Sequence, residues 1–471
     1  MPDSVVVTID VPDPDNFFMA LRTVEDWPNH CVAIVLSPRP VSFAAIPYGL
    51  AFNRLKVLGI RNVIGRIDGT KTLWIENADP GDRGWFYIDE EFRDPAVQED
   101  TDLYLTVSKL RLARYLRDNH IKPSQYRIYT QTINETVGIK PGTHHAMHKP
   151  DFAYGFNDML LEQGAWKDIN KGTAGLGEDE FSRFRELLSE AEAKKGSAKS
   201  AADLYLKIMG EEADFADGSK RSHQRRSDTR LLCRVYAAIQ ARELGCPEFG
   251  DLNELIDWHK ATKAKPMLYI GGPFNEANQI INELGHENIG PVIAMAGASH
   301  GKSNLFDNQF NIHVDPESAK SVLSRAAKKE INLTLIPTEC VKGTAYQLSS
   351  NELMKFNSEP IIELYNQWSA LDPIAPFDIL AAMAVTTYIY KDMLRSVDFT
   401  IDKEGTFVFS NPREAKPGPG LKMGWNEPKM KKNEKGEIFP VFDENPLMQE
   451  RRPYLLKQFE LTLTPPSKTE P

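Results

Sequence analysis

Short apolar runs that end in turn residues recur in the first and last thirds of the chain. They span residues 5–9, 31–36, 267–270, 291–295 and 331–336. Most of the later runs are followed by a segment with helical spacing, such as residues 276–284, which ends at Gly285. Continuous apolar runs of this length are typical of strands buried on both faces of a parallel sheet, with helices as the connections. The pattern therefore predicts an α/β fold with a doubly wound, mostly parallel sheet.

The middle of the chain breaks this alternation. Residues 65–100 are rich in Asp, Gly and Trp, and helical spacing follows at 107–118, 180–193 and 229–243. We therefore predict one main domain over residues 1–410 that carries a large, mainly helical insertion over about residues 65–260. Residues 411–471 are predicted as a C-terminal extension, partly loop or disordered. Its stretch 415–437 combines lysines with Pro, Gly and Asn without a period, which favours a surface loop.

The end of the first predicted strand carries a cluster of acidic residues. The sequence IDVPDPD at 9–15 places Asp10, Asp13 and Asp15 between that strand and the apolar start of a helix. Ligand sites of open α/β sheets lie at the carboxyl ends of strands, and carboxylates this close repel each other unless a cation or proton lies among them. Oxygen donors are the ligands that calcium and magnesium prefer. The pattern fits a metal site, and it also fits a solvated turn whose aspartates cap the next helix.

Composition excludes several classes of function. The formal net charge of −10 over 471 residues argues against sequence-independent nucleic-acid binding, which needs basic surfaces. No stretch approaches the roughly 20 apolar residues of a membrane span, and no secretory signal is visible at the N-terminus. The four cysteines are far apart and form no CxxC pair, so we expect buried free thiols and a cytoplasmic location. Neither nucleic acid nor a membrane is expected as a partner.

Four separated segments resemble, in order, the motifs of the inosine/uridine-preferring nucleoside hydrolases. The sequence IDVPDPD at 9–15 is similar to the family's DxDPGxDD, and IGGPFNEA at 270–277 is similar to TGPLTNxA. The most specific match is QFNIHVDPESA at 309–319, close to EFNxxxDPEAA, and FDILA at 377–381 resembles HDPLA. The resemblance covers roughly residues 1–60 and 262–410 and leaves the middle insertion largely unmatched.

The resemblance implies a single calcium ion at the bottom of the active site. Carried over position by position, Asp10 is a ligand and the general base, and Asp15 and Asp378 are further carboxylate ligands. Asn275 supplies a backbone carbonyl. The implied activity is that of a calcium-dependent N-ribosyl hydrolase, in which water attacks C1′ of a nucleoside or related ribosyl compound. The partner is then a small-molecule ribosyl substrate, and the family's tendency to form dimers or tetramers implies a homo-oligomer.

The same motifs depart from the family where sugar and base are bound. Pro14 stands in place of an aspartate, for which Asp13 could substitute if the turn is re-threaded. A glutamate is replaced by Gln309, and the histidine that assists the leaving base is replaced by Phe377. Arg39 falls near the position of an expected asparagine. The substrate-binding candidates are therefore Asp13, Arg39, Asn304, Gln309, Asn311 and Phe377.

Three alternatives remain open at the level of sequence. Arg39 suits a phosphate or carboxylate on the substrate, and it also suits a surface position beside a proline turn. The histidines at 144, 145 and 148 have a spacing that metal ligands use, and solvated histidines can have the same spacing. The changes at Pro14, Gln309 and Phe377 favour a second function class, a catalytically impaired nucleoside-hydrolase-like protein that serves in binding or as a scaffold.

Overall fold

The structure is a computed structural model. It describes residues 3–10, 14–37, 64–67, 72–75, 85–88, 95–130, 169, 172, 175–197, 204, 207–208, 220–299, 309–313, 315–340, 348–349, 352, 376–386, 392–403, 405–426, 429–432, 436, 438–441 and 446–463.

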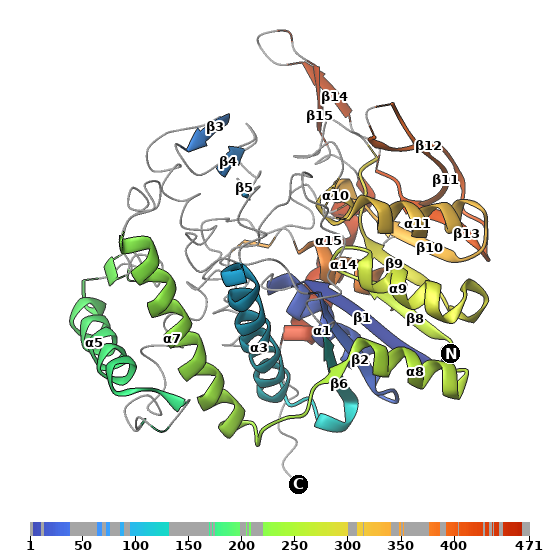
Figure 1. Ribbon diagram of the computed structural model, residues 1–471. Helices are drawn as coiled ribbons and strands as arrows, with labels where there is room; N and C mark the ends of the chain where they lie inside the picture. The colour runs from blue at the N-terminus through green and yellow to red at the C-terminus, as the bar shows by residue number, and fades with distance from the viewer. Residues whose placement is uncertain are drawn as a thin grey trace.

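A ten-stranded sheet forms the centre of the protein, in the order β12-β11-β13-β10-β9-β8-β1-β2-β6-β7 (Figure 1). Only the pairings of β11 with β12 and β13 are antiparallel, and the other pairings are parallel. The strands are β1 (Ser4–Asp10), β2 (Val32–Ser37), β6 (Tyr126–Thr130), β7 (Gly250–Asp251), β8 (Pro266–Ile270), β9 (Val292–Met295), β10 (Asn332–Ile336), β11 (Leu394–Ile401), β12 (Phe407–Glu414) and β13 (Gly420–Gly424).

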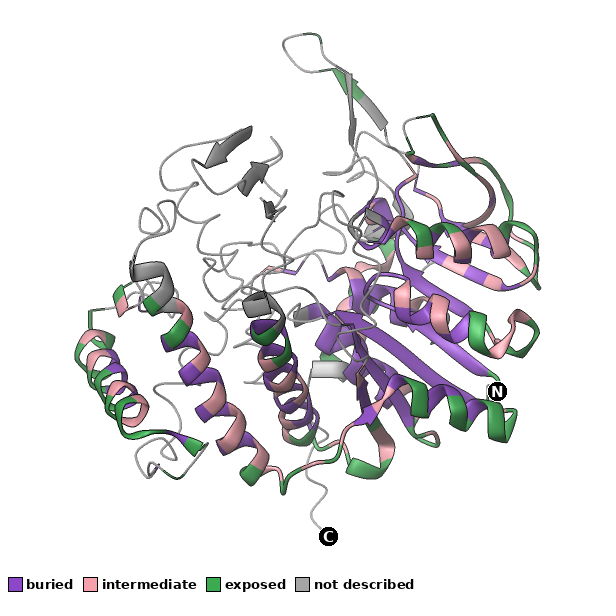
Figure 2. Cartoon of the chain, viewed as in Figure 1, coloured by how far each residue is buried: buried purple, intermediate pink, exposed green. Residues whose placement is uncertain are grey.

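Helices cover both faces of this sheet, so the α/β class predicted from the apolar runs is confirmed. One face is covered by α1 (Pro14–Asp26), α3 (Pro95–Asp118), α14 (Phe377–Thr386) and α15 (Pro446–Leu463). The other face is covered by α8 (Leu252–Thr262), α9 (Asn275–Leu284) and α11 (Pro316–Ala327). Figure 2 shows the central strands as buried along their length, while the outward faces of α8, α9 and α11 are exposed.

The direction of strand addition reverses between β1 and β8. From β1 the chain adds β2, β6 and β7 on one side, and it then returns to β8 and adds β9, β10 and β13 on the other. A crevice opens at such a reversal at the carboxyl ends of the strands, where open α/β sheets bind their ligands. Asp10 ends β1, and Gly271 follows β8 and donates its N–H to the Thr8 carbonyl at 2.8 Å.

Part of the middle of the chain, which was predicted as a mainly helical insertion, belongs to the main sheet. The helices predicted there are confirmed as α3, α5 (Glu178–Lys195) and α7 (Lys220–Glu243). Within the same segment, β6 pairs with β2 in the main sheet, while β3 (Ile64–Ile67), β4 (Thr72–Ile75) and β5 (Trp85–Ile88) form a separate antiparallel sheet. The fully buried Asp100 of α3 accepts hydrogen bonds from Arg226 and Arg230 of α7, at 2.7 and 2.5 Å.

The C-terminal part contributes a strand to the main sheet, and the expectation of a loop over 415–437 does not hold at 420–424. Leu421 and Met423 of β13 are two residues apart and both are buried, a strand period that the surrounding glycines and lysines obscure. The hairpin β14 (Lys429–Lys432) and β15 (Ile438–Val441) follows. The short helix α10 (Phe310–His313) and the 3-10 turns η2 (Pro123–Gln125), η8 (His286–Asn288) and η10 (Thr338–Cys340) complete the described elements.

All four cysteines are free thiols, but only Cys233 and Cys340 are buried as expected. Cys31 and Cys246 are exposed, and each lies between regular elements rather than inside one. Among the described helices, none combines the length and the apolar character that crossing a membrane requires.

Candidate functional site

Asn16 joins two of the predicted metal ligands near the carboxyl ends of the neighbouring strands β1 and β8. Its Nδ2 atom donates to Asp10 Oδ1 at 2.7 Å and to Asp378 Oδ2 at 2.9 Å. Its Oδ1 atom accepts from the backbone N–H of Asp10 at 3.2 Å. The asparagine is 1% exposed, and the two aspartates are 2% and 5% exposed. One amide therefore holds the end of the first strand against the start of α14.

Asp15 completes this group, which we call the aspartate cluster: Asp10, Asp15 and Asp378. Its Oδ2 atom accepts from the backbone N–H of Asp378 at 3.2 Å. Its Oδ1 atom is buried and has no hydrogen-bond partner in the described part of the chain. A buried carboxylate oxygen without a partner is costly, so this atom marks a place where a cation or donor is expected to bind.

Local sequence explains how the cluster forms. Pro14 is the first residue of α1, a position that tolerates the missing N–H, and it puts Asp15 and Asn16 in the first turn. The first turn of α14 likewise carries Asp378. The unsatisfied N–H groups and the dipole at a helix N-terminus favour negative charge. The first turns of α1 and α14 therefore meet, each contributing one acid to the cluster.

Gly271 provides the space that this arrangement needs. A Cβ atom on Gly271 would lie 2.6 Å from both Asn16 Oδ1 and Met19 Sδ, and 3.5 Å from Asp378 Cγ. Two of these distances are shorter than any normal contact, so a side chain here would displace the side chains of Asn16 and Met19 or shift the turn itself. The glycine lets the turn after β8 approach the aspartate cluster closely.

Gln309 and Asn311, both predicted to bind substrate, use their amides on the protein backbone. Asn311 Nδ2 donates to the carbonyls of Gly271 and Met295, each at 2.8 Å. Gln309 Oε1 accepts from the N–H of Asn311 at 3.1 Å and from that of Gly297 at 3.4 Å. Both side chains are buried. These contacts connect the turns after β8 and β9, and a role on the substrate stays a prediction.

A second buried acid lies on the other side of β1. Glu276, in the first turn of α9, accepts a very short hydrogen bond from Ser37 Oγ and another from Asn275 Nδ2 at 2.7 Å. Ser37 ends β2 and is paired in register with Asp10. Asn275 is the first residue of α9, and its backbone carbonyl as a calcium ligand stays a prediction. The contact ties the turn after β8 to the end of β2, across β1.

The other predicted residues contribute less to the described site. Phe377 is half-buried at the start of α14, next to Asp378, and packs against the core. Asp13, Arg39 and Asn304 lie outside the described residues, as do the histidines at 144, 145 and 148. Their predicted roles therefore stay predictions.

Sequence reasoning missed Asn16, Gly271, Ser37 and Glu276. Asn16 directly follows Asp15, and Glu276 occupies the first turn of the helix after a strand, so position alone could have raised both. Ser37 and Gly271 are recognisable only through the partners that the fold brings to them.

The aspartate cluster fits a hard cation in its donor chemistry. Its ligating atoms are carboxylate oxygens, which calcium prefers, and the buried Oδ1 of Asp15 has an unused lone-pair site. Within the described residues, no group of three or more histidine, cysteine or acidic side chains is placed so that it could hold a metal ion. The donors are suitable, and the Asn16 amide lies between two of them.

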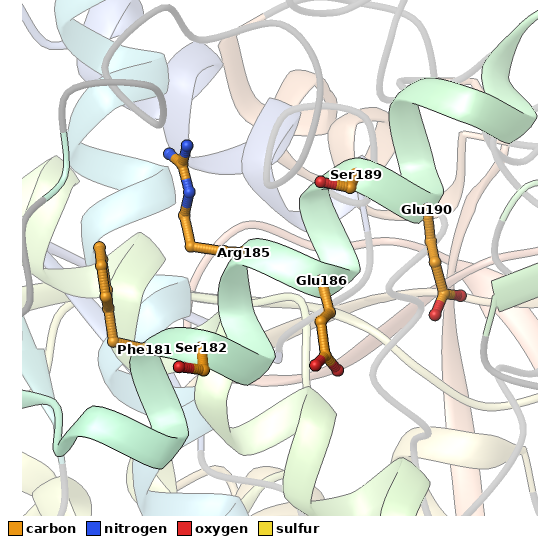
Figure 3. A pocket seen from close by; sticks show the side chains of 6 residues that line it. All are labelled: Phe181, Ser182, Arg185, Glu186, Ser189 and Glu190. Carbon is orange, nitrogen blue, oxygen red and sulfur yellow. The ribbon is translucent and has the colours of Figure 1, made fainter.

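A hollow of about 590 Å³ lies away from this site, on α5. Its lining residues all come from that helix, as Figure 3 shows: Phe181, Ser182, Arg185, Glu186, Ser189 and Glu190. Helices α7 and α3 stand between α5 and the sheet in Figure 1, so the hollow is separate from the aspartate cluster.

Comparisons with known proteins find likeness at the level of structure only. No family model matches the chain, and no curated protein matches it in sequence. Among solved structures, an inosine-uridine preferring nucleoside hydrolase from Bacillus anthracis is 11% identical, with 97% of this chain and 99% of that chain covered and a TM-score of 0.38. An inosine-guanosine nucleoside hydrolase is 10% identical, with 98% of each chain covered and a TM-score of 0.45.

A plant nucleoside hydrolase is 12% identical, with 99% of this chain and 100% of that chain covered and a TM-score of 0.44. At these identities and TM-scores the likeness concerns the course of the chain and carries nothing about activity.

Proposed function

We propose that this protein is a calcium-dependent N-ribosyl hydrolase that cleaves the N-glycosidic bond of a nucleoside or related ribosyl compound. The observation that carries the proposal is the aspartate cluster near the carboxyl ends of β1 and β8, with one buried oxygen of Asp15 lacking a partner among the described residues. Open α/β sheets bind their ligands at the carboxyl ends of the strands, which supports a ligand-binding role for these carboxylates.

Asp10, Asp15 and Asp378 are the residues that would hold the ion, with the Asn275 carbonyl as a further ligand. A bound calcium ion would lower the pKa of a water molecule and fix the sugar hydroxyls. In the proposed reaction the oxygen of water bonds to C1′, and the C1′–N bond breaks with its electron pair leaving on the base. The Asp10 carboxylate takes the proton of the attacking water, the role of a general base within hydrogen-bond reach.

The side chain beside the cluster limits how the leaving group is assisted. Phe377 immediately precedes Asp378 and offers an apolar surface but no proton. The base must then leave as an anion or take its proton from solvent or another residue. This favours bases that are good leaving groups over purines that need protonation.

The second function class, binding or scaffolding without turnover, also has an observation in its favour. The amides of Gln309 and Asn311 hold main-chain groups rather than pointing free into the crevice. A protein that kept the fold and lost substrate contacts would have this arrangement.

Release of free base from a panel of ribosides separates the two classes. The panel contains purine and pyrimidine nucleosides and their 5′-monophosphates, each incubated with the full-length protein and calcium. We expect base release from at least one member and none from the Asp10→Asn variant, whose side chain has nearly the same shape. No release from any member, by a protein that binds calcium and the riboside, would support the scaffold alternative.

A further inference from the structure

Lys422 of β13 is a half-buried amine near the amino ends of the parallel strands, the end of the sheet opposite to the aspartate cluster. Its Nζ atom donates to Asn332 Oδ1 at 2.8 Å and to the Gly418 carbonyl at 2.9 Å. Asn332 is the first residue of β10, and Gly418 lies two residues before β13 begins. The ladder neighbours Thr334 and Ser396 are uncharged as well. Among the described residues, Lys422 therefore has neutral partners and forms no ion pair.

Two features of this setting favour the neutral, nucleophilic form of the amine. Burial lowers the pKa of Lys422 from its usual value. A neutral amine has two N–H bonds and one lone pair. When both N–H bonds are donated to Asn332 and Gly418, the lone pair points away from these two acceptors. Lysines with a lowered pKa are the ones that proteins use to form imines with carbonyl compounds.

Three exposed lysines flank this amine, and we call them the lysine patch: Lys328, Lys329 and Lys416. The first two follow α11, which neighbours β13 in Figure 1. A Cβ atom on Gly420, the first residue of β13, would lie 4.0 Å from Lys329 Cγ. Lys416 lies two residues before Gly418, whose carbonyl accepts from Lys422. The turns on both sides of the amine therefore carry positive charge.

The lysine patch is not neutralised by nearby acids in the described part of the chain. Glu330, the next residue after the patch, forms a salt bridge with Arg325 at 3.6 Å. Glu414 of β12 is paired in register with Arg395 of β11. The whole chain has a formal net charge of −10, so this corner differs in sign from the protein as a whole. A local excess of positive charge concentrates small anions at a surface.

We propose that Lys422 is a modification site that forms an imine with a phosphorylated aldehyde, whose phosphate group is held by the lysine patch. In this step the lone pair of Nζ bonds to the carbonyl carbon. The carbonyl oxygen then leaves as water with the two protons of the amine. C=N replaces C=O, so the step needs neither an oxidant nor a reductant. The inference is independent of the proposed function, because it concerns the opposite end of the sheet.

The experiment uses pyridoxal 5′-phosphate as the probe and pyridoxal, which lacks the phosphate, for comparison. The full-length protein is treated with each aldehyde, the imine is reduced with borohydride, and peptide mass spectrometry gives the labelling rate of each lysine. Lys260 is the control amine, because its hydrogen bond to Glu283 raises its pKa. We expect Lys422 to be labelled faster than Lys260, and the difference to be larger at neutral than at alkaline pH.

The role of the lysine patch is measured by the effect of the phosphate. Pyridoxal 5′-phosphate should label Lys422 about fivefold faster than pyridoxal does, which corresponds to about 1 kcal/mol and to a few exposed ion pairs. The double variant Lys329→Ala and Lys416→Ala should lose this preference and keep the rate with pyridoxal. Lys109 is the matched control, since burial lowers its pKa too, while Asp102 opposes the shift. Its preference for the phosphate should be smaller.

Three results would overturn the proposal. The first is labelling of Lys422 no faster than that of Lys260 at neutral pH. The second is an equal rate with the two aldehydes, which would leave Lys328 and Lys329 the ordinary role of cations at a helix C-terminus. The third is an equal preference for the phosphate at Lys109, which would make that preference a general effect rather than a property of the lysine patch.

Discussion

The backbone N–H of Asp378 donates to Asp15 Oδ2 at 3.2 Å, which joins residues 363 positions apart in the sequence. This one contact brings the first turn of α14 to the first turn of α1. It leaves the other oxygen of Asp15 buried and without a partner in the described residues. The contact therefore helps to build the aspartate cluster and leaves one buried acceptor atom of Asp15 available to a ligand.

Asp15→Asn should abolish calcium binding while the fold is retained. The amide oxygen can still accept from Asp378, but the negative charge that would hold the ion is gone. The melting temperature without calcium should be unchanged or higher, because a buried charge has been removed. Calcium titration and thermal melts check this, and wild-type affinity in the variant would place the ion elsewhere.

Gly271→Ala should destabilise the protein by about 1–3 kcal/mol, since its Cβ would lie 2.6 Å from Asn16 Oδ1 and Met19 Sδ. Chemical denaturation measures this change. Gly196→Ala is the control, because no atom lies within 4 Å of its Cβ position and its backbone is right-handed helical. The control should be neutral or slightly stabilising. Equal stability of the two variants would mean that the turn after β8 does not approach the cluster as described.

Glu25 gives the protein a definite pH dependence. Burial, opposed by Arg22 and assisted by Asp26, raises the pKa of this carboxyl from 4.5 to about 8. Between these two values the unfolded chain loses the proton while the folded chain keeps it. The folded state therefore binds more protons, and its stability falls as the pH rises from about 4.5 to about 8.

Glu25→Gln removes the titrating carboxyl and with it this loss of stability at high pH. We expect the variant to melt about 2 °C or more above the wild type at pH 8, and the difference to vanish near pH 4.5. The exposed Glu317→Gln is the control and should show no such pH-dependent difference. A Glu25→Gln variant that gains nothing at pH 8 would show that the carboxyl is ionised in the folded protein.

Phe377 should limit the leaving group in the proposed reaction. We expect purine ribosides to be cleaved with kcat below about 10 s⁻¹, because Phe377 cannot donate a proton to the base. Phe377→His should raise purine release by about 10²-fold, the lower range of general-acid contributions. Rapid purine release by the wild type would show that another acid acts, and the histidines at 144, 145 and 148 would be the first to mutate.

The sequence predicts the sheet well where both faces are buried. Strands such as β1 and β8 are continuous apolar runs, which is why the sequence predicts them as buried strands of a parallel sheet. β13 and β6 escape prediction because their buried residues are few and lie among Gly, Lys, Arg and Tyr. Such strands are defined by the neighbours that they pair with.

The site is predictable to a smaller extent. Asp10 and Asp15 stand out because acids lie between a strand and the start of a helix, whereas Asp378 is indicated only by the resemblance of FDILA to a family motif. The role of Asn16 depends on Asp378, which is 362 positions away. The close approach of Gly271 likewise depends on Asn16 and Met19, which are distant from it in the sequence. Contacts between residues so far apart in the sequence are made by the fold and leave no local pattern in the sequence.

The central claim is tested most directly by following riboside hydrolysis while calcium is removed and restored. Free base released from the best substrate of the panel is measured with calcium, after chelation, and after calcium is added back, for the wild type and Asp15→Asn. The account predicts that wild-type hydrolysis stops on chelation and returns with calcium, and that the variant is inactive throughout. Hydrolysis that continues undiminished in the chelator, or in the variant, would contradict it.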